Sequence, residues 1–290
     1  MKKQGRITIK HTQWDLITFA FCGFRGVFDE KISLLASLAE PEPWETEQSN
    51  YPNDILFYYI TKQFARCNQQ GLIVSSTDGD YCVSNTGLMT SYTEDIYCLF
   101  QRNRSFGMPS KSGKVISTKW MFVGFFNRSA REITSINFPK EPGLPVFWEN
   151  PSEVFFDADL PVRASLNHII DDHWNRKEKV IPNGLVKFGK GMVATVFKEA
   201  LQTSIKKAKR NMFLVVPQFY DGKYMFLMPI VLPVPGPQGH VTIALALEKQ
   251  GNEYRGNTIF DLGAAYKKAR LVNRPESNWL KINEANKPGC

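Results

Sequence analysis

Side chains that could exchange protons lie in the segment NHIIDDHW. His168 and Asp172 are four residues apart, so on a helix their side chains share one face. Histidine changes charge near neutral pH, and His168 can therefore serve as a general acid or base. Tyr266, in the segment AAYKKAR, could also donate a proton. The pattern predicts His168, Asp172 and Tyr266 as catalytic residues, with a structural hydrogen bond or metal ligation as the alternatives for His168.

Cations gather in the second half of the chain. The segment from Arg163 to Arg210 holds eleven Lys and Arg against four Asp and Glu, which is nearly all of the formal net charge of +8. Such an excess favours polyanionic partners, including RNA and nucleotides. Lys206, Lys209 and Arg210 share one face near the end of an expected helix, where the helix dipole also favours cations. A phosphate clamp and a solvated helix end are both compatible with this pattern.

Further polar residues follow this helix. Gln218 and Tyr220 are two positions apart, so a regular strand turns both to one face, where they could contact a base or a sugar. A polar hairpin end is the alternative. Arg270, one turn after Tyr266, could clamp a phosphate or pair with a neighbouring carboxylate. The residues predicted to bind phosphate or nucleic acid are Lys206, Lys207, Lys209, Arg210, Gln218, Tyr220, Arg270 and Arg274.

Several functional classes lack their signatures in this sequence. It contains no GxxxxGK[ST] loop, no GxSxG elbow and no HExxH motif, so no cofactor is evident, and a divalent metal has no supporting motif. The five cysteines include no CxxC pair, which favours buried free thiols in a reducing compartment. The N-terminus does not resemble a signal peptide, and no apolar run approaches about 18 residues. We therefore expect a cytoplasmic protein with no membrane partner.

The elements that position these residues are clearest in the second half. The segment MVATVFKEALQTSIKKAKRN predicts an amphipathic helix whose Phe197, Leu201 and Ile205 pack onto a sheet. Four strands follow in MFLVVPQFY, YMFLMPIVLP, VTIALALE and YRGNTIF, with hairpins at Asp221-Gly222 and at residues 250–252. A last helix begins after Asp261, a good N-cap residue.

The first half mixes helix and hairpin. We expect a helix in DILFYYITKQFARCNQQG, a hairpin in LIVSSTDGDYCVS, a tight turn at residues 85–87 and a buried strand in WMFVGFF. The spacing of Ile96, Leu99 and Phe100 predicts a helical segment. The proline-rich segment INFPKEPGLPVFWENPSE suggests a boundary between an N-terminal part, 1–137, and a basic C-terminal part, 138–290, although one continuous domain is the alternative. The expected class is α+β: a mostly antiparallel sheet with helices packed on one face, and a smaller mixed α/β N-terminal part.

Six phrases carry a resemblance to a known family: LAEPEPW, SNTGL…EDIYCLF, LNHIIDD, KRNMFLVVPQFY, YRGNTIFDLGAAYKKARL and RPESNWL. In this order, over residues 38–280, they resemble the bacterial family called domain of unknown function 3825. The resemblance implies no catalytic residues. Some members are joined to OST-HTH (LOTUS-like) modules, a predicted RNA-binding type, which implies an RNA context. The segment RKEKVIP departs from the family pattern of an arginine followed by an aromatic residue and proline.

These features predict an RNA- or nucleotide-directed protein. It could be a phosphoester hydrolase that uses His168 as acid or base and an Arg/Lys clamp for phosphate. The alternatives are a non-catalytic RNA-binding module and a structural or protein-interaction domain. Catalysis requires His168 and several cations to converge on one pocket, whereas binding requires an open basic surface with exposed aromatic residues.

Overall fold

The structure, a computed structural model, describes residues 16–23, 25–46, 49, 51–109, 113, 115–148, 150–175, 180–220, 222–234, 239–275 and 278–280. The chain divides into two compact units: a first unit of Met1–Glu45 with Ser49–Val146, and a second unit of Thr46–Gln48 with Phe147–Cys290. Each unit contains one five-stranded, mostly antiparallel sheet with helices packed against it. The α+β class is therefore confirmed, while the domain boundary expected at residues 137/138 stays a prediction.

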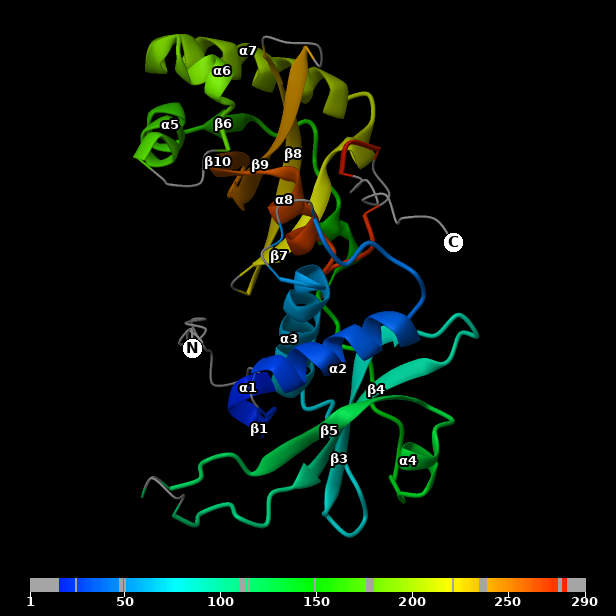
Figure 1. The fold of residues 1–290 in the computed structure, drawn as a ribbon. Helices are drawn as coiled ribbons and strands as arrows, with labels where there is room; N and C mark the ends of the chain where they lie inside the picture. Colours follow the sequence, from blue (N-terminus) through cyan, green and yellow to red (C-terminus); the bar gives the residue numbers. More distant parts are fainter. Residues whose placement is uncertain are drawn as a thin grey trace, which may run out of the picture. The chain divides into compact units, whose positions relative to one another are not determined.

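The sheet of the first unit has the strand order β1-β5-β4-β3-β2, in which only the short β1–β5 pair is parallel. Helices α1–α3 cover one face and α4 lies on the other (Figure 1). The elements are α1 (Leu16–Phe19), β1 (Ala20–Phe21), α2 (Arg25–Leu38), α3 (Asp54–Gln69), β2 (Val74–Ser75), β3 (Tyr81–Met89), β4 (Asp95–Arg102), β5 (Trp120–Asn127) and α4 (Arg131–Thr134).

Aromatic rings hold the three helices to this sheet. Phe19 of α1 and Phe64 of α3 both contact Phe100 of β4, with ring centroids 5.3 and 5.4 Å apart. Phe28 of α2 lies edge-on to Phe122 of β5 at 5.5 Å. Such tilted and edge-on pairs contribute attraction beyond the area they bury. The aromatic richness of the sequence is therefore used to build this core.

The helical segment predicted around Ile96, Leu99 and Phe100 is wrong, because these residues lie in strand β4. Residues 96–100 are all buried, since the sheet is covered on both faces at this central strand. A strand buried on both faces has no polar–apolar alternation, and its apolar run can imitate helical spacing. The tight turn expected at residues 85–87 is also wrong: this segment is a bulge within β3, and the chain reverses at Thr90–Glu94 instead.

The sheet of the second unit has the strand order β6-β10-β9-β8-β7, with the β6–β10 pair parallel. The four strands expected from the sequence form β7–β10, and the long helix and the final helix are α7 and α8. The elements are η1 (Pro151–Val154), β6 (Val162–Ala164), α5 (Leu166–Asn175), α6 (Asn183–Val186), α7 (Gly189–Ala208), η2 (Met212–Leu214), β7 (Val216–Tyr220), β8 (Lys223–Pro233), β9 (His240–Gln250), β10 (Glu253–Phe260), α8 (Leu262–Ala269) and η3 (Asn278–Leu280).

Helices lie against both faces of this second sheet. Leu245 and Leu247 of β9 join the cluster formed with Ile169 of α5 and Phe197 of α7. The intervening Ala246 points to the opposite face, which is the face of Phe260 in the strand register. Helix α8 lies on that face, because its Lys268 lies over the ring of Phe260. Helices α5–α7 thus share one face and α8 covers the other (Figure 1), so the expectation that the helices of this sheet pack on one face is wrong for α8.

Local signals at two predicted positions are confirmed. Asp261 caps α8, its Oδ1 accepting a hydrogen bond from the amide of Ala264 at 2.7 Å. In α7, Phe197 and Leu201 are buried and Ile205 packs against the same cluster. Among the described residues, no helix has the length and apolar character needed to cross a membrane.

Four cysteines of the first unit, Cys22, Cys67, Cys82 and Cys98, are buried free thiols, as predicted, while Cys290 lies outside the described residues. Burial raises the pKa of Cys67 from 9.0 to about 11. Between these pH values the folded thiol keeps its proton while the unfolded thiol loses it. The stability that Cys67 contributes is therefore complete below pH 9 and is lost as the pH rises toward 11.

We therefore expect the free energy of unfolding of the first unit to fall above pH 9 by about 1.4 kcal/mol per pH unit for each such thiol. Urea unfolding at about pH 8 and about pH 10.5 measures this fall in the wild type and in Cys67→Ser, whose hydroxyl does not titrate there. The variant should lose less stability over the interval. An identical loss in both proteins would show that Cys67 does not contribute to the pH dependence.

Candidate functional site

The C-terminal end of α7 and the residues just after it carry four exposed cations: Lys206, Lys207, Lys209 and Arg210. The Nη1 group of Arg210 donates a hydrogen bond to the carbonyl oxygen of Lys206 at 2.7 Å, so this side chain also caps the helix. Cations are favoured at this end, because its last carbonyl groups carry partial negative charge. The position alone thus accounts for part of the cation cluster.

The cations extend along the solvent side of α7. The helix buries a stripe that includes Val193, Phe197 and Leu201. Lys198, about two turns before Lys206, therefore lies on the exposed side with Lys206 and Lys209. We call the set Lys198, Lys206, Lys207, Lys209 and Arg210 the α7 basic face. Among the described residues, none of its four lysines forms an ion pair with a carboxylate. The charge of this face is therefore directed to solvent.

Apolar side chains are exposed at the N-terminal end of α7, the opposite end from Lys206 and Arg210. Phe188, immediately before the helix, is 61% exposed, and Met192 in its first turn is 52% exposed. Lys187 and Lys190 flank Phe188 in sequence and are exposed too. Lys190 pairs with Asp171 of α5 at 2.5 Å, so its charge is partly neutralised within the protein. An exposed ring among cations is a combination that single-stranded nucleic acid can use.

The predicted catalytic residues are not brought together. His168 is exposed on α5 and Asp172 is half-buried on the same helix, which lies on the α7 face of the sheet. Tyr266 is buried on α8, across the sheet from α5. His173, the second histidine of the segment, is buried. Their roles in catalysis stay predictions, and a shared pocket for His168 and Tyr266 does not exist in this arrangement.

The remaining predicted residues lie around β7 and α8. Gln218 and Tyr220 share a face of β7, as predicted, because the strand keeps a regular register with β8 through Pro217, which an edge strand tolerates. Gln218 is 1% exposed and Tyr220 is 54% exposed. At the end of α8, Arg270 is half-buried and Arg274 beyond it is exposed. This group lies on the opposite sheet face from the α7 basic face.

One residue beside Tyr220 was missed in the sequence. Lys268 is half-buried, with its Nζ 4.6 Å from the ring centre of Tyr220 and 4.9 Å from that of Phe260. A cation over two rings gains electrostatic attraction from both. No sequence signal places Lys268 there, because the two rings come from β7 and β10.

A metal centre is not supported within the described ranges, where no group of three or more His, Cys, Asp or Glu side chains could hold an ion. Three of the cations counted in the sequence, Arg176, Lys177 and Lys179, lie outside these ranges.

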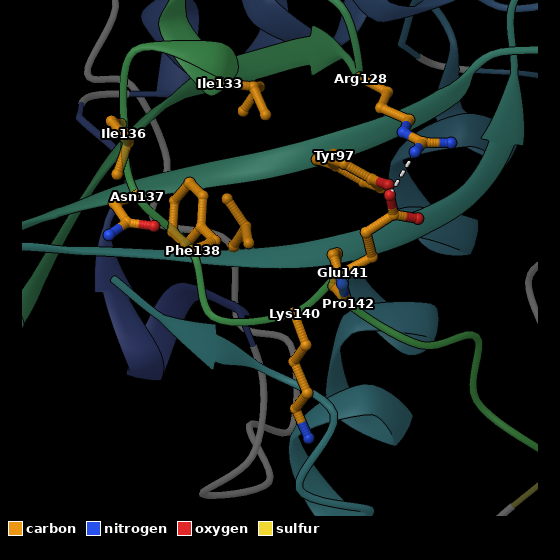
Figure 2. A pocket seen from close by; sticks show the side chains of 10 residues that line it. Tyr97, Arg128, Ile133, Ile136, Asn137, Phe138, Lys140, Glu141 and Pro142 are labelled. Atoms are coloured by element: carbon orange, nitrogen blue, oxygen red, sulfur yellow. Dashed lines mark ion pairs between the residues drawn. The ribbon is translucent and has the colours of Figure 1, made fainter. Parts of the chain in front are cut away.

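The first unit holds a pocket of about 290 Å³ that no sequence motif indicates (Figure 2). Its polar side includes Tyr97, Arg128 and Glu141, and the Arg128 guanidinium pairs with the Glu141 carboxylate at 2.5 Å. Its apolar side includes Ile133 and Phe138. The lining comes from the neighbouring strands β3 and β4, from Arg128 directly after β5, from α4 and from the segment that follows α4, so only the folded sheet assembles it.

The two sheets and their helices define an α+β protein with an exposed cationic helix. The model of a family described as "Domain of unknown function (DUF3825)" matches residues 35–279, and the chain belongs to this family. No curated protein and no solved structure matches the chain. The family resemblance seen in the sequence is thereby confirmed.

Proposed function

We propose that this protein binds single-stranded RNA through the α7 basic face of its second unit. The observation that carries the proposal is a row of exposed cations, from Lys198 to Arg210, whose lysines have no carboxylate partner among the described residues. Phosphates that replace solvent and counterions at such a row release those counterions, which drives binding. Phe188, at the other end of the helix, adds an exposed ring on which a base can stack.

The placement of the candidate residues favours RNA binding without catalysis over RNA hydrolysis. A phosphoester hydrolase would need His168 and the clamping cations around one substrate. His168 and Tyr266 lie on opposite sides of the second sheet, so these two candidates cannot act on the same bond. An open basic surface requires no such convergence. Turnover by His168 alone stays a prediction.

The test replaces Lys198, Lys206 and Lys209 together by glutamine. Glutamine has nearly the helix propensity of lysine, so α7 should persist. Arg210 is kept, because it caps the helix. Loss of three phosphate contacts should weaken binding of an oligouridine of about 12 nucleotides by roughly 100-fold at about 0.1 M salt, measured by fluorescence anisotropy.

A matched control removes the same charge elsewhere in the second unit. Arg163 and Arg255 share the carboxylate of Glu253, and Lys223 pairs with Glu248, so two carboxylates partly compensate these three charges. Replacing these three exposed cations by glutamine should leave RNA affinity within about threefold of wild type, because they lie outside the α7 basic face and are paired with carboxylates. The fold should persist, since surface ion pairs contribute little to stability. Equal losses in both triple variants would mean that net charge, and not the α7 basic face, determines binding, and the proposal would be rejected.

A further inference from the structure

The pocket of the first unit is built on two neighbouring strands and closed by the segment that follows α4. Val83 of β3 and Tyr97 of β4 belong to the sheet, and the segment Ile133–Pro142 runs across them (Figure 2). This segment is fixed at Asn137, whose carbonyl oxygen accepts hydrogen bonds from the amide and the Oγ1 of Thr77, both at 3.0 Å. The pocket therefore lies between the sheet and the segment Ile133–Pro142, which is fixed by these hydrogen bonds.

Tyr97 brings a buried hydroxyl to this pocket. Its side chain is 2% exposed, and its Oη has no hydrogen-bond partner among the described residues. A buried hydroxyl without a partner loses its solvation with nothing in return, so such groups normally meet a bound molecule or water. Burial and, to a lesser extent, the nearby Glu141 and Asp95 carboxylates raise the pKa of Tyr97 to about 12. The phenol is thus a neutral hydrogen-bond donor at physiological pH.

The hydroxyl of Tyr97 is turned toward the ion pair of Arg128 and Glu141 (Figure 2). The side chains of Arg128 and Glu141 are 60% and 58% exposed, so their attraction is screened by water and the pair can open at small cost. Lys140 lies on the same rim. The ionised groups of the lining are Arg128, Lys140 and Glu141, so cations outnumber carboxylates. When the Glu141 side chain moves away from Arg128, this side of the pocket becomes more positive. An anion can then take the place of the carboxylate beside Arg128.

Apart from Asn137, the rest of the lining is apolar. The apolar wall consists of Ile133, Ile136 and Phe138, together with Val83 and Pro142. A ligand for this pocket should therefore combine an anionic group with a flat, weakly polar body. The volume of about 290 Å³ lies at the lower end of ligand sites, which suits one small molecule and not an extended chain.

We propose that this pocket binds one nucleotide, with its phosphate accepting hydrogen bonds from Tyr97 Oη and from Arg128 after Glu141 has moved aside, and with its base against the half-buried side chains of Ile136 and Phe138. The proposal extends the proposed function from a surface that holds an RNA backbone to a site for a single nucleotide. The same chemistry fits a free mononucleotide and the 5′-phosphorylated end of an RNA strand.

Isothermal titration of the full chain with adenosine monophosphate tests the site. Tyr97→Phe keeps the buried ring and removes only the donor, so affinity should fall by about 10-fold or more, as expected for a hydrogen bond to a charged group. Glu141→Gln frees Arg128 from its competitor, and affinity should rise severalfold. Adenosine, which lacks the phosphate, should bind at least about 10-fold more weakly than the monophosphate. Melting curves confirm that both variants are folded.

The two proposals fail separately. The variant with Lys198, Lys206 and Lys209 replaced should lose oligouridine but bind adenosine monophosphate as the wild type does. Displacement of adenosine monophosphate by 5′-phosphorylated oligouridine, but not by the unphosphorylated strand, would assign the pocket to RNA ends, and no displacement would assign it to free nucleotides. Wild-type affinity in Tyr97→Phe, weaker binding in Glu141→Gln, or no heat of binding at millimolar nucleotide would overturn the pocket proposal.

Discussion

Replacing Phe197 by alanine is expected to lower the free energy of unfolding of the second unit by about 3–5 kcal/mol. The Phe197 side chain is fully buried in the middle of α7, where it packs with residues of β8, β9 and α5. Its removal loses the free energy of burying a ring and leaves a cavity that the surrounding helix and sheet cannot fill. Denaturant unfolding followed by circular dichroism measures the loss.

The control for this prediction is Lys198→Ala, one position further along the same helix. Lys198 is exposed and belongs to the α7 basic face, so its truncation should change stability by no more than about 0.5 kcal/mol. If the two variants unfold at the same denaturant concentration, α7 does not pack on the sheet as described.

Replacing Gly87 by alanine is expected to destabilise the first unit by roughly 2–5 kcal/mol, from backbone strain and overpacking together. Gly87 has a φ of +73° within the bulge of β3, a conformation that side chains with a Cβ rarely adopt. A Cβ there would lie 2.5 Å from Nε2 of Gln63 and 2.5 Å from Oη of Tyr59, both on α3. Either the bulge or α3 would have to move.

The variant Gly71→Ala distinguishes the cost of backbone strain from the cost of overpacking. Gly71 has a similar φ of +66°, but a Cβ would meet no atom within 4 Å. Gly71→Ala should therefore show only the backbone cost, roughly 1–2 kcal/mol. Thermal or urea unfolding of the two variants gives the difference, which measures the close approach of β3 and α3. Equal destabilisation would contradict this close packing.

The second unit was the more predictable from sequence, because its signals are local. The apolar stripe through Phe197 and Leu201 and the cap at Asp261 depend on residues only a few positions apart. The hairpin strands β8 and β9 are long apolar runs next to turn residues. The placement of α8 opposite α5–α7 was not predictable, since helix periodicity shows that a helix has an apolar face but not which side of the sheet receives it.

The first unit was harder to predict, because its decisive contacts are distant in sequence. Ile96, Leu99 and Phe100 have helical spacing, and only the pairing of β4 with both β3 and β5 makes them a central strand. The bulge at Gly87 was misread as a turn for the same reason, since glycine with positive φ serves both structures.

Of the two candidate sites, one could be predicted from the sequence and the other could not. The cluster of Lys206, Lys209 and Arg210 was evident from sequence, as charge and helical spacing suffice to describe an exposed face. The pocket at Tyr97 and Arg128 was not, because its lining joins β3 and β4 with residues that follow β5. Residue types there are ordinary, and the unusual feature is the buried hydroxyl, which appears only in the folded chain.

The salt dependence of RNA binding tests the central claim most directly. Each phosphate contact to single-stranded RNA contributes about 0.7 to the slope of log affinity against log salt, so removing Lys198, Lys206 and Lys209 should flatten the slope by about 2. The control variant, with Arg163, Lys223 and Arg255 replaced, should keep the wild-type slope. An unchanged slope in the α7 variant, measured with oligouridine over the same salt range, would contradict the account, because the α7 basic face would then make no phosphate contacts.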